Sequence, residues 1–177
     1  MSIDPAIARM YAENVRAKVI PKAHPTKLAP ALVQKIREKV PVFKGMPLDC
    51  LNSTLLLGEH VTFKAGEVVF NEGDLGDSFF VLLSGQVVIE KNQQGRPVEL
   101  ARLGVVDCFG EMALVGLDAR SATVRALVDT VTMRFYAETV DANVTSASYI
   151  YRNVANILAK RLKESSINLA NMTAKPA

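Results

Sequence analysis

Hydrophobic residues change their spacing twice along this chain, and the changes divide it into helical and strand-forming parts. Over roughly the first third, apolar side chains recur every three or four positions, the period of an amphipathic helix. This pattern predicts helices over residues 5–17, 31–39 and 48–57. A proline-rich linker separates the first two of them and contains Pro21, Pro25 and Pro30.

From His60 onward the apolar residues follow the spacing of short strands. These runs alternate with turns that contain glycine, a pattern typical of an antiparallel sandwich or small barrel. Seven strands are predicted, over residues 61–63, 67–70, 79–83, 86–90, 97–103, 122–127 and 130–136. We therefore predict an α+β fold in which an antiparallel β-roll, or jelly-roll sandwich, is flanked by N-terminal and C-terminal helices.

The last part of the chain returns to helical spacing. One apolar stripe runs through it, formed by Ile150, Val154, Ile157, Leu158 and Leu162. We predict a long helix over about residues 148–169 and a frayed polar tail over 171–177. The periodicity leaves open whether this helix packs on its own domain or pairs with a second copy as a homodimer.

Charge is concentrated near the N-terminus. Residues 1–39 hold eight basic and three acidic residues, a net charge of +5, whereas the whole chain of 177 residues carries only +3. We therefore divide the chain into a basic helical arm over 1–39, a domain over 40–170 that includes the C-terminal helix, and the tail. The arm is either a solvated helix face or a contact surface for an acidic partner.

Composition excludes several classes of protein. Apolar residues make up 49% and charged residues 22%, as in globular domains, and no apolar run is long enough for a membrane helix. The N-terminus lacks the apolar core of a secretory signal, and tryptophan is absent, which argues against a base-stacking surface. The cysteines and histidines lack metal-ligand spacing, so we expect no metal. We expect Cys108 to be a buried, apolar residue. Two cysteines without a disulfide framework favour a reducing, cytoplasmic location.

The residues with the most chemical information interrupt the strands between positions 107 and 121. Gly110 lets the backbone approach a ligand, and residues 111–114 can form one helical turn whose free amides favour an anion. Arg120 adds a fork of donors suited to a phosphate or carboxylate, whereas Glu111 accepts hydrogen bonds and suits hydroxyls. Together they describe a site for a ribose that carries a phosphate. The alternative is a surface ion pair between Glu111 and Arg120.

These residues resemble the phosphate-binding cassette of the cyclic nucleotide-binding domain family. That cassette reads approximately FGE-[LIM]-AL, a short spacer and PR-[ASTQ]-AT-[VI], and this chain has FGEMAL at 109–114 and RSATV at 120–124. Upstream, AGEVVFNEGDLGDS at 65–78 and FFVLLSGQV at 79–87 are similar to two hairpins of the family. The resemblance therefore covers about residues 40–165.

The resemblance implies that Glu111 holds the ribose 2′-hydroxyl and Arg120 the exocyclic phosphate oxygens. It places six further ligand-binding residues around them: Phe109, Gly110, Met112, Ala113, Ser121 and Ala122. Ala119 stands where proline is usual, which makes the turn before Arg120 less rigid. Ser121 stands where some cGMP-preferring members have threonine, so cAMP is favoured over cGMP.

The function that the resemblance implies is a cytoplasmic cyclic nucleotide sensor whose C-terminal helix moves to cover the purine. Because enzyme motifs such as GxSxG, a P-loop or HExxH are absent, we expect no catalytic residues. We also expect no helix-turn-helix module after the last helix, no membrane contact, and a protein effector that contacts the arm or the C-terminal helix. The alternative is a protein of the same fold that binds another small anion or no ligand.

Overall fold

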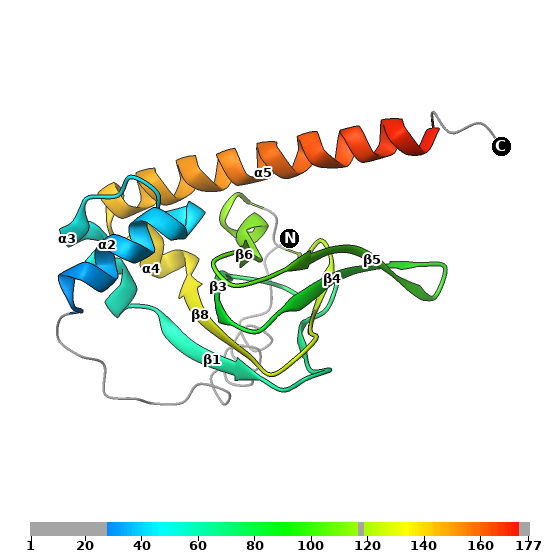
Figure 1. The fold of residues 1–177 in the computed structure, drawn as a ribbon, viewed down its shortest axis with the longest axis horizontal. Coiled ribbons are helices and arrows are strands. Elements are labelled where there is room, and N and C mark those ends of the chain that lie inside the picture. The colour runs from blue at the N-terminus through cyan, green and yellow to red at the C-terminus, as the bar shows by residue number, and fades with distance from the viewer. Residues whose placement is uncertain (1–27, 117–118, 174–177) are drawn as a thin grey trace.

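The computed structural model describes residues 28–116 and 119–173, and its centre is a sandwich of two four-stranded antiparallel sheets (Figure 1). The first sheet contains, in spatial order, β1 (Glu59–Phe63), β8 (Thr130–Tyr136), β3 (Ser78–Ser84) and β6 (Cys108–Phe109). The second contains β2 (Val68–Phe70), β7 (Thr123–Ala126), β4 (Val87–Gln93) and β5 (Arg96–Leu103). Along the chain, helices come before and after the strands of the sandwich, so the predicted fold class is confirmed.

All seven predicted strands are present, with small shifts at their ends. β4 continues to Gln93, past the predicted start of the turn, because Gln94 and Gly95 both adopt positive φ and close a two-residue hairpin to β5. The prediction missed β6, which is only two residues long and pairs with Phe80 and Val81 of β3. A two-residue strand is too short to show alternating apolar and polar positions, and its pairing with β3 depends on a segment far away in the sequence.

Two of the predicted helices, over residues 31–39 and 48–57, are confirmed to within one residue. They are α2 (Pro30–Lys39) and α3 (Leu48–Leu56), joined by the single turn η1 (Pro41–Phe43). On α2, Val33 is buried in the core and Ile36 packs against it, whereas Leu32 is exposed. The predicted helix over 5–17, the linker prolines before Pro30 and most of the basic arm lie outside the described residues.

The C-terminal helix is longer than predicted. After the short helix α4 (Ala137–Asp141), α5 (Val144–Thr173) begins before residue 148 and continues through residue 173. The prediction of a frayed tail from residue 171 is therefore wrong for its first three residues, because no glycine or proline interrupts the helix there. Ile150 and Val154 are fully buried, and Ile157 and Leu158 pack partly buried against the same core, but Leu162 is 70% exposed, so the apolar stripe packs only as far as Leu158.

Strand β3 separates two hydrophobic cores. Because side chains alternate along a strand, Phe79 and Val81 face the helices, whereas Phe80 and Leu82 face the interior of the sandwich. The outer core joins β3 and β8 to α3, η1 and α5, and the inner core joins the two sheets. Among the described helices, none has the length and apolar character needed to cross a membrane.

Candidate functional site

The segment after β6 folds as predicted into one helical turn, η2 (Glu111–Leu114). Gly110 precedes it with a φ of +75°, in the left-handed region that favours glycine. A Cβ atom at this position would lie 2.7 Å from Nη1 of Arg120. Both the backbone conformation and the close approach therefore require glycine, and η2 begins directly beside the arginine.

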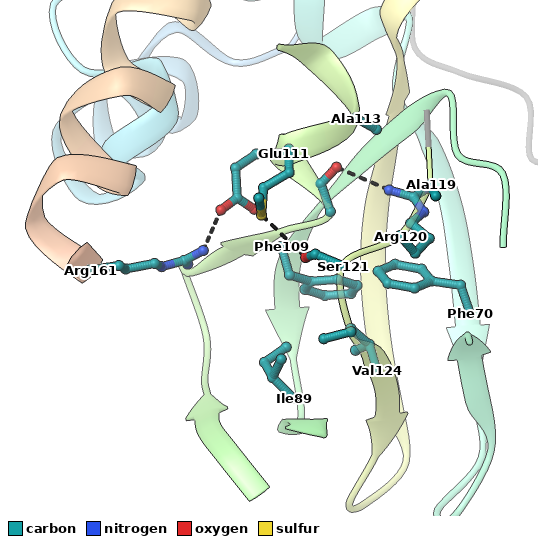
Figure 2. A pocket seen from close by; sticks show the side chains of 13 residues that line it. Phe70, Ile89, Phe109, Glu111, Ala113, Ala119, Arg120, Ser121, Val124 and Arg161 are labelled. Carbon is teal, nitrogen blue, oxygen red and sulfur yellow. Dashed lines mark hydrogen bonds and ion pairs between the residues drawn. The ribbon is translucent and has the colours of Figure 1, made fainter. Parts of the chain in front are cut away.

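Arg120 is 5% exposed and is held by backbone on two sides. Its Nη1 donates hydrogen bonds to the carbonyl oxygens of Ser78, at 2.8 Å, and of Gly110, at 3.0 Å. Its guanidinium lies 4.1 Å from the centre of the Phe70 ring, and Figure 2 shows the two side chains next to each other. The arginine is thus held in place by contacts within the protein.

Gly76 has a role in the site that the sequence did not indicate. It belongs to a turn, and a Cβ atom there would collide with Nε of Arg120. Gly76 therefore makes room for the arginine.

The backbone around Ala119 is fixed without the proline that the family usually has there. The amide of Arg120 donates to the carbonyl of Asp74 at 2.7 Å, and the carbonyl of Arg120 accepts from the amide of Gly73 at 2.8 Å. Ala119 itself forms an antiparallel bridge with Leu75. These contacts with residues 73–75 supply the rigidity that the alanine does not.

Glu111 is 2% exposed and faces the C-terminal helix. Its Oε1 accepts a short hydrogen bond from Nη1 of Arg161 on α5 (Figure 2). Nη2 of Arg161 donates to the carbonyl of Cys108 at 2.6 Å. The alternative interpretation, a surface ion pair between Glu111 and Arg120, is wrong, because both side chains are buried and they bond to different partners.

One pocket contains all eight site residues that the sequence predicted. Its complete lining is Phe70, Ile89, Phe109, Gly110, Glu111, Met112, Ala113, Ala119, Arg120, Ser121, Ala122, Val124 and Arg161. Ser121 and Met112 meet across it, with Oγ and Sδ 3.2 Å apart. The pocket therefore offers donors, one carboxylate and apolar surface, which suit an anionic sugar with an apolar base.

Five lining residues were not predicted as site residues, and one of them is Ala119, in the turn before Arg120. Phe70, Ile89 and Val124 come from three strands of the second sheet and form apolar surface. Their alternation along the strands indicates burial, but it does not indicate which buried residues border a pocket. No motif in the sequence assigns a residue of the C-terminal helix to the site, and Arg161 lies off the apolar stripe of that helix. Its contact depends on where α5 passes the sandwich.

The neighbourhood of Glu111 also affects Cys108. Burial, and then the negative charge of Glu111, raise the pKa of the Cys108 thiol to about 12. The thiol therefore stays protonated near neutral pH, and the predicted burial of Cys108 is confirmed. Within residues 28–116 and 119–173, no group of histidine, cysteine and carboxylate side chains could hold a metal ion.

Comparisons with known proteins agree with this geometry. Residues 60–144 match the family model described as "Cyclic nucleotide-binding domain". The "Cyclic AMP receptor protein" of Thermus thermophilus is 30% identical over 130 residues, which are 73% of this chain and 60% of that protein. The "cAMP-dependent protein kinase regulatory subunit" of Schizosaccharomyces pombe is 30% identical over 95 residues, which are 54% of this chain and 22% of that protein. The chain thus spans about 60% of the length of the bacterial relative.

Solved structures resemble the same part of the chain. The catabolite activator protein of Thermus thermophilus superposes with a TM-score of 0.67 at 29% identity, covering 75% of this chain and 63% of that one. A cyclic nucleotide-binding domain from Methylobacillus flagellatus superposes with a TM-score of 0.71 at 18% identity, covering 85% of this chain and 89% of that one. At that identity the second likeness concerns the fold alone.

Proposed function

Because residues 60–144 belong to the cyclic nucleotide-binding domain family, we propose that the pocket beside η2 binds a cyclic nucleotide and that the chain is a regulatory sensor. One observation carries this proposal: a buried arginine and a buried glutamate, Arg120 and Glu111, line one pocket that is otherwise largely apolar. A cyclic nucleotide combines the monoanion, the hydroxyl and the apolar base that such a pocket suits.

In this proposal Arg120 binds the exocyclic phosphate oxygens and Glu111 accepts a hydrogen bond from the ribose 2′-hydroxyl. Backbone groups of residues 109–113 approach the sugar and phosphate, and Ser121 and Ala122 complete the phosphate cradle. Because Ser78 and Gly110 already hold the guanidinium, binding costs little side-chain ordering.

We propose cAMP as the preferred nucleotide. Ser121 is the residue that supports this choice, since some cGMP-preferring members of the family have threonine at the matching position. The names of the Thermus and Schizosaccharomyces relatives refer to cAMP, which agrees with this choice. Ser121 Oγ also has a nearby partner in Sδ of Met112.

The sensor function requires that α5 respond to the ligand. Arg161 of α5 binds Glu111, the residue that we assign to the ribose, so ligand binding and helix position involve the same carboxylate. A carboxylate can accept several hydrogen bonds, and a ligand held by Glu111 under Arg161 favours the docked helix. The ligand then stabilises one position of α5 over others, as a switch requires.

The remaining parts of the proposal concern the context of the sensor. We propose that it is not an enzyme and that its effector contacts α5 or the N-terminal arm. A reducing, cytoplasmic location agrees with its two cysteines, Cys50 and Cys108, which are both free thiols.

Calorimetric titration with cAMP, cGMP and 5′-AMP tests the binding function. We expect cAMP to bind most tightly and Arg120→Ala to cost about 2–5 kcal/mol, because the phosphate loses a buried charged partner. That corresponds to a Kd about 30-fold to several thousand-fold higher. Arg102→Ala removes an equal charge from an exposed pair on β5 and is the matched control. A Kd for Arg120→Ala within threefold of the wild-type value, at equal thermal stability, would remove Arg120 from the site.

A further inference from the structure

A second guanidinium is buried beside Arg120. Arg134 on β8 is 2% exposed. In the pairing of β8 with β3 it lies opposite Phe80, whose ring is in the inner core. Burying a guanidinium is costly unless charges and hydrogen bonds compensate it. Two buried arginines in one small sandwich therefore need a physical reason.

Ser78, the first residue of β3, joins the two arginines. Its hydroxyl oxygen accepts a hydrogen bond from Nε of Arg134 at 2.9 Å and lies 3.4 Å from Nη2 of Arg120. Its carbonyl oxygen accepts the 2.8 Å bond from Nη1 of Arg120. Ser78 is fully buried, so water does not compete for these contacts. A single residue thus relates the position of one guanidinium to that of the other.

The positive charge of Arg134 is only partly compensated inside the protein. Its Nη2 lies 3.3 Å from Oδ1 of Asp77, but the Asp77 side chain is 60% exposed, which weakens the pair. The guanidinium also lies 4.2 Å from the centre of the Tyr136 ring. Among the described residues, its buried Nη1 has no hydrogen-bond partner.

The other charged group near Arg134 is Glu59, its pairing residue on β1. Burial, together with a hydrogen bond from the Tyr136 hydroxyl to Glu59, raises the pKa of that hydroxyl to about 12, although the charge of Arg134 acts in the opposite direction. Among the described residues, the buried Oε2 of Glu59 has no hydrogen-bond partner. On the side toward Ser78, the neighbouring charged group is the cation Arg120.

We propose that Arg134 is a positioning residue for the anion site, which acts through Ser78 on Arg120 and adds its own positive charge to that site. This inference rests on the proposed cyclic nucleotide function. A bound monoanion then stabilises two buried guanidiniums and not one, which gives a reason for the second. Neither Ser78 nor Arg134 lines the pocket, so neither is assigned a contact with the ligand.

Three variants separate positioning from folding. Arg134→Met removes the charge and the bond to Ser78 but keeps an unbranched apolar side chain, and such replacements of buried ions are often tolerated. Ser78→Ala removes only the hydroxyl and keeps the carbonyl that binds Arg120. Arg102→Met, at an exposed pair on β5, controls for the loss of one positive charge. Thermal unfolding of each variant without ligand establishes that it is folded.

Two readouts follow for each folded variant: the Kd for cAMP, and the NMR signals of the Arg120 guanidinium in the ligand-free chain, assigned by their loss in Arg120→Lys. We expect a roughly tenfold higher Kd for Arg134→Met and a smaller increase for Ser78→Ala, as for loss of a hydrogen bond to a charged group. The double variant is expected to be less than additive. In Arg134→Met and Ser78→Ala, the Arg120 signals should show that rotation of the guanidinium is no longer restricted. In Arg102→Met these signals should stay unchanged.

Each outcome has one meaning. If Arg134→Met leaves either the Kd or the Arg120 signal unchanged, the proposed role of Arg134 is overturned. In that case the proposed function still stands as long as the wild-type protein binds cAMP. If wild-type protein binds no cyclic nucleotide while the Arg120 signal responds to Arg134→Met, the proposed function fails and the mechanical link through Ser78 stands. If Arg134→Met does not fold, the same two criteria, the Kd and the Arg120 signal, are applied to Ser78→Ala.

Discussion

Glycine at two positions makes the buried arginine of the site possible. Gly76 and Gly110 lie on either side of the Arg120 guanidinium, and a Cβ atom at either would come within 2.7 Å of it. Only Gly110 has a positive φ, so at Gly76 the requirement is space alone. The side chain of Arg120 therefore depends on two residues that contribute no functional group of their own.

The space at Gly76 yields a direct test. We expect Gly76→Ala to fold, because its φ suits any residue, and to raise the Kd for cAMP about tenfold or more as the methyl group displaces the guanidinium. The matched control is Gly104→Ala, since a Cβ atom there meets nothing within 4 Å. Titration of both variants gives the comparison. Equal Kd values in the two would mean that Arg120 does not need its observed position for binding.

At the scale of single elements, β3 and α5 decide how the site is built. β3 contributes Phe80 to the inner core and Phe79 to the outer one, so its position is determined from both faces. α5 is anchored at its start, where Nδ2 of the buried Asn153 donates to the carbonyls of Val42 and Lys44. Further along the helix, residues 162–167 are exposed. Arg161 lies between these parts and makes the contact with the pocket.

Amide hydrogen exchange tests the response of α5. With saturating cAMP we expect slower exchange over residues 155–165, because a ligand held by Glu111 stabilises the contact with Arg161 and suppresses local opening. The residues around Asn153 should change little, since their contacts exist without ligand. Saturating 2′-deoxy-cAMP, which lacks the hydroxyl assigned to Glu111, should slow exchange less.

Arg161→Met is the matched variant for that experiment, since it keeps the helix and the stem of the side chain. We expect it to lose most of the cAMP-dependent protection while the phosphate contact of Arg120 remains. Equal protection of residues 155–165 with and without cAMP in the wild-type chain would mean that α5 is static and that the switching mechanism is wrong.

At the scale of the whole molecule, α5 connects the outer core with the site at the inner core. Ile150 and Val154 lie among the outer-core residues of α3, η1 and β3, and Arg161 borders the pocket two turns further on. A displacement of α5 near the ligand would therefore change how the helices pack against one another in the outer core. Cys108 lies where these parts meet, since it belongs to the outer core and its carbonyl accepts the bond from Arg161.

The buried thiol of Cys108 makes global stability depend on alkaline pH. The unfolded state loses this proton at its ordinary pKa of about 9, whereas the folded state holds it to about 12. The folded state thus binds more protons between these values, and the free energy of unfolding should fall as pH rises from 9 to 12. Denaturant unfolding at several pH values measures this slope.

Cys108→Ala should lower stability at neutral pH, through the lost packing, but show a shallower decline above pH 9. Tyr136 and Tyr151, whose pKa values burial also raises to about 12, contribute equally in both proteins. Cys50→Ala retains Cys108 and should keep the wild-type slope. Parallel declines for wild type and Cys108→Ala would show that Cys108 is accessible or ionised in the folded protein.

The sequence by itself determined the fold class and the local part of the site. Strands alternate with a period of two and helices repeat every three or four residues, so β1, β3, β8 and α3 were predictable from nearby residues alone. The predicted site residues lie within 14 positions, from Phe109 to Ala122, so one continuous stretch of sequence was enough to name them.

Only the tertiary structure decided which distant residues support that site. Gly76, Ser78, Arg134 and Arg161 reach it from three other segments, through strand register and through the path of α5. Their positions depend on long-range packing, because a one-residue shift of β3 or β8 would turn Ser78 or Arg134 to the opposite face. The extra length of α5 has a local cause instead, since the helix continues past its packed residues through a stretch without glycine or proline, where the apolar pattern no longer reports packing.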